Sequence, residues 1–166
     1  MNTTAGLPIA QYRRFDSFSE YEALFDSLIP NTERVVRVFD RALPPAWNNP
    51  SRTALLRPFL RASPANRLYV IVHATDNIER TLPRLIELYR DFGHAFKIRQ
   101  TPKMARHLYD SFSLFDASHY LHRFHYAHMR SALGTHDVEG ARQLLDRYLE
   151  LWDASVPVNI AGPTGL

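Results

Sequence analysis

Short apolar runs, some of them alternating with polar residues, predict a series of β-strands along the chain. Residues 34–40 are β-branched and alternate, which is typical of a strand with one buried face. Residues 68–73 are apolar on both faces, as is expected of a central strand in a parallel sheet. The predicted strands cover residues 34–40, 68–73, 95–100, 111–116 and 119–126, and the last two are close enough in sequence to form a hairpin.

Apolar positions three and four residues apart predict helices between these strands. A capping box that begins at Ser19 opens the first helix, and Thr81 is expected to cap the third. Pro58 lies inside the second helix and is expected to break or kink it. The predicted helices cover residues 19–29, 55–60, 81–92, 101–108 and 137–153.

Strands that alternate with helices predict an α/β sandwich with a mainly parallel sheet, a C-terminal hairpin-like pair of strands and helices on both faces. The length of 166 residues and the apolar fraction of 45% fit one globular domain. We expect an N-terminal arm over 1–14, the α/β domain over 15–155 and an irregular tail over 156–166. The sequence shows no secretion signal and no membrane-spanning run, so we expect a cytoplasmic protein without membrane insertion.

Arginine dominates the positive charge of the chain. Two of the 20 basic residues are lysines, Lys97 and Lys103, and the other 18 are arginines. Seven arginines and one acid lie between residues 34 and 67, whereas the last predicted helix is acidic. This asymmetry indicates an anionic ligand or a self-complementary partner such as a second copy, although a solvated surface explains it equally. The chain has no cysteine, which excludes disulfides, thiolate metal sites and a cysteine nucleophile.

Residues 109–116 read Tyr-Asp-Ser-Phe-Ser-Leu-Phe-Asp. This stretch resembles the H-x-K-x-x-x-x-D motif of the phospholipase D-like superfamily, with Tyr109 at the His position, Ser111 at the Lys position and Asp116 at the Asp position. The basic strand ending at Arg99 and the closing Leu-Trp-Asp-Ala-Ser at 151–155 also resemble that superfamily, the latter a bacterial non-catalytic branch of it. The resemblance covers roughly residues 15–155.

The resemblance implies a fold that has lost its chemistry. Catalytic members of the superfamily hydrolyse or transfer phosphodiesters through a phosphohistidine, and they need two H-x-K motifs that face each other, from two repeats or from a dimer. Only Asp116 matches the motif here, so the resemblance implies that phosphodiesterase activity has been lost. A carboxylate just after an apolar strand is also a common turn or cap residue, which is the plainer role for Asp116.

Four histidines recur at every third residue, from His119 through His122 and His125 to His128. On a strand, His119 and His125 would lie on one face and His122 on the other, so these side chains would not converge on a metal ion. We therefore assign no metal, no cofactor and no catalytic residue. The candidate ligand-binding residues are Tyr109, Ser111, Asp116, Arg123, His125, Lys97 and Arg99.

Three functions follow from these patterns. The leading hypothesis is a non-catalytic binding or regulatory domain for an anionic or phosphate-containing ligand or a protein partner, and a homodimer is compatible with it. The second is nucleic-acid binding through the Arg-rich surface, although no nucleic-acid-binding motif is recognisable. The third is a divergent phosphodiesterase or metal-dependent hydrolase that uses the cluster of His119, His122 and His125.

Overall fold

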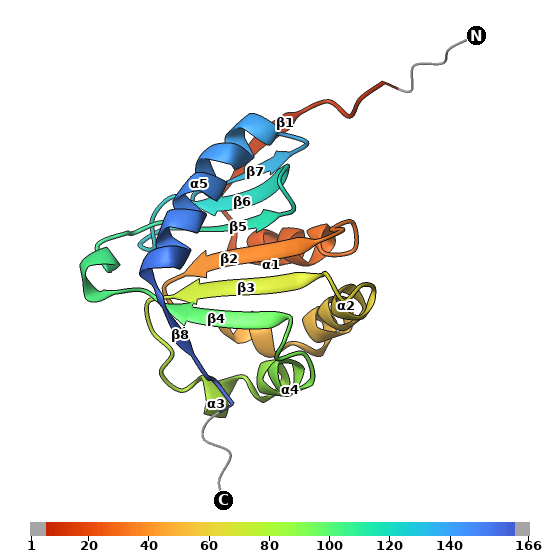
Figure 1. The fold of residues 1–166 in the computed structure, drawn as a ribbon. Helices are drawn as coiled ribbons and strands as arrows, with labels where there is room; N and C mark the ends of the chain where they lie inside the picture. The colour runs from red at the N-terminus through yellow and green to blue at the C-terminus, as the bar shows by residue number, and fades with distance from the viewer. Residues whose placement is uncertain (1–5, 162–166) are drawn as a thin grey trace, which may run out of the picture.

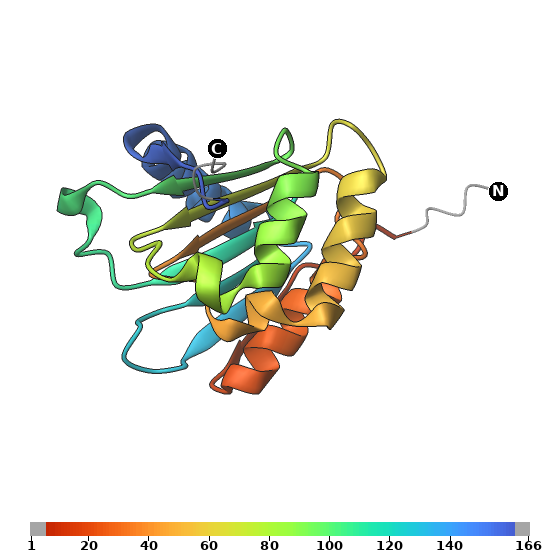
Figure 2. The ribbon, with the colours of Figure 1, turned by 90° about the horizontal axis from the view of Figure 1, so that it is seen from below.

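The computed structural model describes residues 6–161, which form one eight-stranded sheet with helices on both faces (Figures 1 and 2). The strand order is β1-β7-β6-β5-β2-β3-β4-β8. The strands are β1 (Gln11–Phe15), β2 (Val35–Asp40), β3 (Arg67–Val72), β4 (Phe96–Gln100), β5 (Ser111–Phe115), β6 (His119–Arg123), β7 (Ser131–Thr135) and β8 (Val156–Val158).

The prediction of a mainly parallel sheet is wrong. Only β2–β3 and β3–β4 pair in parallel, and the other five strand pairings are antiparallel. The physical reason lies in the connections: parallel neighbours need a crossover, and helices supply it between β2, β3 and β4. A short turn joins β5 to β6 and a short loop joins β6 to β7, so these strands must run antiparallel.

Three strands were not predicted, and two of them form the edges of the sheet. β1 lies within the segment expected as an arm, and β8 begins the tail expected to be irregular. The parts of that arm and tail at 1–5 and 162–166 lie outside the described residues. β8 pairs with β4 and contains Pro157, whose backbone has no N–H to donate. The predicted strand over 119–126 ends at Arg123, because the chain turns into a loop there.

The helices divide unequally between the two faces of the sheet. Helices α1, α2 and α4 lie on one face, and the long helix α5 crosses the other (Figures 1 and 2). The bounds are α1 (Phe18–Leu28), α2 (Pro50–Arg61), α3 (Ile78–Thr81), α4 (Pro83–Asp91) and α5 (Val138–Ala154), with 3₁₀ turns η1 (Pro45–Asn48) and η2 (Lys103–Ala105).

Several predicted helix ends differ from the observed ones. The side chain that caps α1 is Ser17 rather than Ser19, since its oxygen accepts the N–H of Glu20. Thr81 ends α3 instead of capping α4, and α2 continues through Pro58. The helix predicted over 101–108 is a single 3₁₀ turn. The final helix is confirmed, with Asp137 as its capping residue.

Each face of the sheet covers its own apolar core. Beneath α1, α2 and α4 lie the aliphatic side chains of the central strands, including Val36, Val38 and Val70. Beneath α5 lies a smaller and more aromatic core that includes Phe112 and Tyr148. The alternation of side chains along each strand therefore fixes which residues can meet at either end of the sheet.

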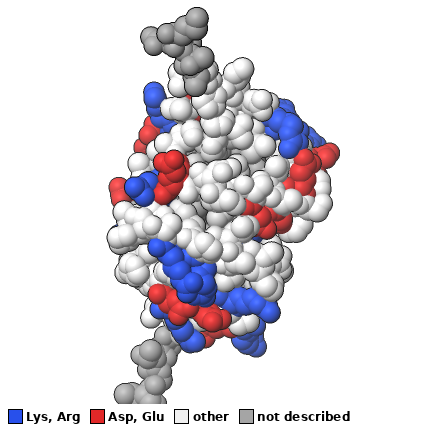
Figure 3. All heavy atoms as spheres, turned by 90° about the vertical axis from the view of Figure 1, so that its right-hand side faces the viewer, with Lys and Arg blue, Asp and Glu red and all other residues white. Residues whose placement is uncertain are grey.

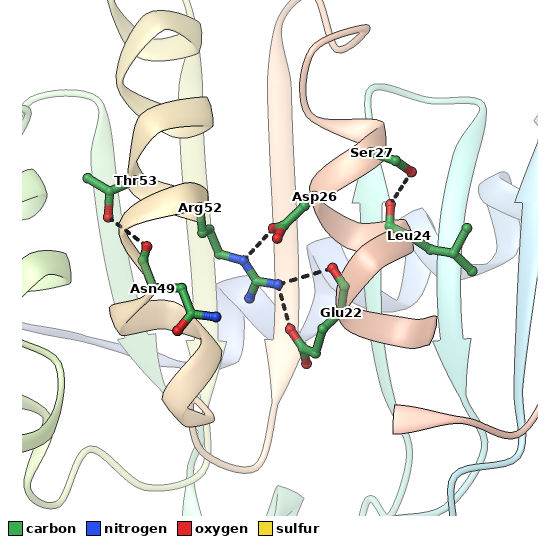
Figure 4. Close-up of polar contacts among 7 residues, drawn as sticks. All are labelled: Glu22, Leu24, Asp26, Ser27, Asn49, Arg52 and Thr53. Carbon is green, nitrogen blue, oxygen red and sulfur yellow. Dashed lines mark hydrogen bonds and ion pairs between the residues drawn. The ribbon is translucent and has the colours of Figure 1, made fainter. Parts of the chain in front are cut away.

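A buried arginine joins α1 to α2 (Figure 4). Arg52 is 1% exposed, and its Nε donates to Asp26 at 2.7 Å while its Nη2 donates to the carboxylate of Glu22. The guanidinium also lies 4.4 Å from the centre of the Phe25 ring and 5.1 Å from that of Trp47. Burial of this charge is tolerated because two carboxylates neutralise it.

Replacing Arg52 with methionine should destabilise the fold. The change leaves two partly buried carboxylates without their cation, and we expect the free energy of unfolding to fall by about 2–4 kcal/mol in a urea titration. Arg57→Met on the same helix is the matched control: its partner Asp91 is 47% exposed, so a loss below about 1 kcal/mol is expected. Equal losses in the two variants would contradict this account.

Candidate functional site

The parallel strands β2, β3 and β4 all end at one edge of the sheet, which we call the carboxyl-end edge and which lies on the left of Figure 1. Because β5 runs antiparallel to β2, the chain enters β5 at the same edge. Tyr109 and Ser111, at the altered motif positions, therefore lie near Asp40 and His73, which end or follow β2 and β3. Ligands in α/β folds bind at such edges.

His73 is held in place by hydrogen bonds. Its Nε2 lies 3.2 Å from the carbonyl oxygen of Leu108, an acceptor, so Nε2 carries a proton. Its Nδ1 lies 2.6 Å from the hydroxyl of Thr101, which donates to it in the neutral form. Burial lowers the pKa of His73, consistent with a neutral ring. His73 thus has a structural role.

Aromatic rings gather beside Tyr109. We call the rings of Tyr109, His125 and Tyr126 the aromatic stack, since the Tyr109 and His125 centroids lie 5.1 Å apart and those of His125 and Tyr126 lie 4.8 Å apart. Tyr109 is 50% exposed and Tyr126 is 46% exposed. The guanidinium of Arg41 lies 3.9 Å from the centre of the Tyr126 ring. The stack therefore offers open aromatic surface beside a positive charge.

The charges of Arg41 and Arg123 act on the carboxyl group of Asp40 at this edge. Burial raises the pKa of Asp40 from 3.8 to about 7, although the backbone N–H of Arg41 and the charge of Arg123 act in the opposite direction. Arg123 donates to the carbonyl oxygens of His128 and Tyr126 at 2.8 and 2.7 Å, so it also braces the loop after β6. Nη1 of Arg41 is buried and has no hydrogen-bond partner among the described residues.

A groove of about 540 Å³ adjoins the aromatic stack, and we call it the basic groove. It lies where β1 ends and β7 begins, next to the loop between β6 and β7. The ring of His128, which lines it, stacks 5.7 Å from that of His125. The groove is lined by Arg14, Phe15, Asp16, Phe124, His128, Arg130 and Ser131.

Asp116 lies at the opposite end of β5, about 17 Å from Ser111 if each residue of the strand rises about 3.4 Å. Its Oδ1 accepts the N–H groups of Arg34 and Val35 at 2.8 and 3.0 Å, and its Oδ2 accepts that of Glu33 at 2.8 Å. Its backbone is left-handed, with φ 54°. The carboxylate is therefore a cap for the start of β2.

The two basic residues proposed on β4 do not reach the carboxyl-end edge as free charges. Lys97 donates to the carbonyl oxygen of Gly93, near the start of β4. Arg99 donates to the carbonyl oxygen of Trp152 at 2.8 Å, and its guanidinium lies 4.4 Å from the centre of the indole ring. Arg99 thus holds the last turn of α5 against the sheet.

The four histidines separate. His119 starts β6 at the far edge, whereas His125 and His128 lie in the loop after β6. His122 donates from Nε2 to Asp110 at 2.7 Å, and Arg147 donates twice to the same carboxylate. Burial alone would raise the pKa of Asp110, but these hydrogen bonds outweigh it and hold the pKa well below its usual value. Within residues 6–161, no group of three or more His, Asp or Glu side chains is arranged to hold a metal ion.

The sequence indicated part of this site. It grouped seven candidate residues, of which the structure brings Tyr109, Ser111, Arg123 and His125 to one edge and leaves Asp116, Lys97 and Arg99 in other roles. It did not include Asp40 or Arg41 among the candidates, and it missed Arg14 because β1 had no strand signal. The abundance of arginine was the available signal for a basic site. It could not bring Arg14 and Arg130 together, because they are distant in sequence and meet only through the pairing of β1 with β7.

The family model for a domain of unknown function, DUF7931, matches residues 18–159. The chain belongs to the DUF7931 family. No curated protein sequence matches it. Among residues 6–161, no helix of this DUF7931 domain has both the length and the apolar character needed to span a bilayer.

Solved structures show that this DUF7931 domain has a phospholipase D-like fold. It is similar to Nuc from Salmonella typhimurium, a phospholipase D family member, with a TM-score of 0.66 and 12% identity over 91% of this chain and 99% of that one. NucT from Helicobacter pylori gives a TM-score of 0.55 and 12% identity over 90% and 100% of the two chains. The archaeal chromatin protein TrmBL2 gives 0.65 and 8% identity over 94% of this chain and 57% of that one.

Removing the Asp116 carboxylate should cost stability. Asp116→Ala loses three hydrogen bonds to a carboxylate and places alanine in a left-handed conformation, so we expect a fall of about 3–4 kcal/mol in the free energy of unfolding. Asp116→Asn keeps one acceptor oxygen and tolerates that conformation, and its loss should be about half as large. Urea titrations of both variants test this, and an alanine variant as stable as the asparagine variant would contradict the cap.

The raised pKa of Asp40 should appear in the pH dependence of stability. An Asp that titrates near 7 when folded and near 3.9 when unfolded binds its proton more tightly in the native state, so its contribution to stability is lost as the pH rises from about 4 through 7. We expect Asp40→Asn to stabilise the protein relative to wild type at pH 8 and to lose this advantage near pH 4. A midpoint near 4 for the Asp40 carboxyl in an NMR titration would refute the assignment.

Proposed function

We propose that this chain is a non-catalytic domain that binds a phosphate-containing anion at its carboxyl-end edge. The observation that carries the proposal is the basic groove, where Arg14, Arg130 and His128 surround a concave surface beside the aromatic stack. Arginine forks suit phosphate oxygens because they can donate two parallel hydrogen bonds.

The motif positions support the absence of phosphodiesterase chemistry. Tyr109 stands where the resemblance places a nucleophilic imidazole, and a phenol has no ring nitrogen with which to form a phosphohistidine. Ser111 stands at the lysine position, is 8% exposed and carries no charge to neutralise a phosphoryl group. Asp116, the matching residue, is engaged by three backbone N–H groups at the other end of β5.

Basic charge outweighs acidic charge within the groove. Two arginines line it against one acid, Asp16. The guanidinium of Arg14 lies 5.5 Å from the centre of the Phe124 ring, and no ion pair joins it to a described carboxylate. We assign four of the candidate residues to the ligand site at this edge: Tyr109, Ser111, Arg123 and His125.

The domain limits of 15–155 also stay a proposal. Arg14, which lines the groove, lies just outside these limits.

A single-stranded nucleic acid is the second candidate ligand. The exposed rings of Tyr109 and Tyr126 favour it, because bases stack on aromatic side chains while neighbouring arginines contact the phosphates. The solved structure of the similar chromatin protein TrmBL2 shows a novel mode of DNA binding, which also supports a nucleic-acid ligand. A homodimer stays a prediction from the uneven charge.

Binding measurements with two probes test the proposal. Arg14→Gln combined with Arg130→Gln should weaken binding of tripolyphosphate by about tenfold or more in calorimetric titrations, since each lost charged hydrogen bond is worth about 1.5–3 kcal/mol. A labelled 12-nucleotide oligothymidylate, followed by fluorescence anisotropy at two salt concentrations, tests the nucleic-acid alternative. Stacking predicts an additional loss in Tyr109→Ala for the oligonucleotide but not for tripolyphosphate.

The matched control removes two arginines elsewhere on the surface, with Arg61→Gln and Arg142→Gln together. This pair should change either affinity less than about twofold, because local contacts rather than net charge hold the ligand. Equal losses in the two double variants, or no binding by the wild type, would refute the proposal. So would turnover of a phosphodiester substrate that His119→Ala or His125→Ala abolishes, which would instead support the hydrolase hypothesis.

A further inference from the structure

A second groove lies at the opposite edge of the sheet, where the parallel strands begin, and we call it the amino-end groove. Its volume is about 760 Å³. It lies between the segment that leads into β2, the turn between β5 and β6, and the sheet-facing side of α5. It is lined by Asn31, Glu33, Arg34, Val35, Arg37, Asp116, Ala117, Ser118, His119, His136 and Leu145.

Arg37 on β2 carries a charge that has no direct ion-pair partner among the described residues. It is half-buried, and no hydrogen bond or ion pair joins it to any residue between 6 and 161. Its cross-strand neighbours are Tyr69 on β3 and Leu114 on β5, neither of which is an acid. Burial lowers the pKa of Arg37. A partly desolvated cation of this kind, with guanidinium nitrogens that still reach solvent, can be stabilised by an anion that binds in the groove.

Histidines supply further donors to the same groove. Nδ1 of His119 accepts the backbone N–H of His136 at 2.9 Å, so in the neutral ring the proton lies on Nε2. The two rings meet edge to face with centroids 4.5 Å apart, and His136 has a left-handed backbone with φ 51°. The start of β6 and the residue after β7 thus place the imidazoles of His119 and His136 together on one wall of the groove.

The acids of the groove make no direct ion pair with Arg37. Both oxygens of Asp116 accept the backbone N–H groups of residues 33–35, and its charge acts on Arg37 only through space, where it favours the charged guanidinium. Glu33 is exposed. The guanidinium of Arg34 donates to Asn66 and to the carbonyl oxygen of Glu33 through Nη1, and its Nε and Nη2 make no hydrogen bond within the described part of the chain. The wall therefore presents more donors than acceptors.

The surrounding surface is not generally basic. Figure 3 looks onto this edge of the molecule, and it shows blue and red side chains lying next to one another around a broad uncharged area. The view therefore shows no continuous positive surface at this edge. The donors of the groove instead form a local site.

We propose that the amino-end groove binds a phosphate-sized anion, either inorganic phosphate or the phosphoryl group of a larger molecule, through Arg37 with Arg34 and His119. The site lies at the other end of β2 and β5 from the basic groove, so it is independent of the function proposed above. Leu145 on α5 offers an apolar contact for an organic group attached to the phosphoryl oxygen.

Titration of the full chain with inorganic phosphate and with phenyl phosphate, followed by NMR, tests this site. We expect saturable shifts in the amide signals of Arg34, Arg37 and His119, and at least tenfold weaker binding in Arg37→Gln. Arg37→Lys, which keeps the charge but not the fork, should lie between them. Tighter binding of phenyl phosphate than of inorganic phosphate would identify a phosphorylated molecule as the source, and equal binding would identify the free ion.

The double variant Arg14→Gln and Arg130→Gln is the control, because it alters only the basic groove. It should keep the phosphate affinity at the amino-end groove, whereas Arg37→Gln should keep tripolyphosphate binding at the basic groove. Unchanged phosphate affinity in both Arg37 variants, with amide spectra that show a folded chain, would overturn the proposal. Shifts confined to the carboxyl-end edge would overturn it as well.

Discussion

The carboxylate of Asp116 joins the two halves of the sheet. β2 is parallel to β3 on one side and antiparallel to β5 on the other, so it is the strand at which the two pairing patterns meet. Asp116 follows β5 and accepts the three N–H groups that lead into β2, while its own N–H donates to the carbonyl oxygen of Val35 at 2.8 Å. These bonds fix the register between the strands, and that register brings Tyr109 and Ser111 beside the end of β2.

This role gives the last residue of the motif a structural function that requires no reaction. A left-handed turn that must also present two acceptor oxygens suits aspartate, and alanine provides neither property. Tyr109 and Ser111 serve no comparable function in the backbone. One is half-exposed in the aromatic stack, and the other is enclosed by neighbouring strands. The scaffold therefore constrains Asp116 independently of any reaction at the opposite edge.

Much of the architecture could be predicted from the sequence, because the central strands and α5 have strong apolar patterns. The β5–β6 hairpin was also predicted, but the strands β1, β7 and β8 were not, since they carry weaker signals. β1 reads Gln-Tyr-Arg-Arg-Phe and buries one residue, and β7 contains Gly134, where an added Cβ would lie 2.2 Å from the Tyr120 ring. Such edge and close-packed strands depend on their neighbours rather than on their own composition.

The residues of the candidate site also differ in how well the sequence could place them. Residues adjacent in sequence to the motif could be placed from the sequence, whereas Arg14 and Arg37 could not. Arg14 reaches the basic groove only because β1 pairs with β7, and the lack of a partner for Arg37 is a property of the tertiary fold. Lys97 and Arg99 show the converse, since outward-facing basic residues on a predicted strand turned out to bond to backbone carbonyl oxygens.

The two outer strands also limit how copies of this domain can associate. Pro157 in β8 has no N–H to offer an incoming strand, and β8 has only three residues, so continuation of the hydrogen-bond ladder beyond that side is blocked. β1 is longer, but it presents Arg13 and Arg14 along its open margin. Edge-to-edge polymerisation is therefore disfavoured at both margins, which protects a broad, strongly twisted sheet from aggregation.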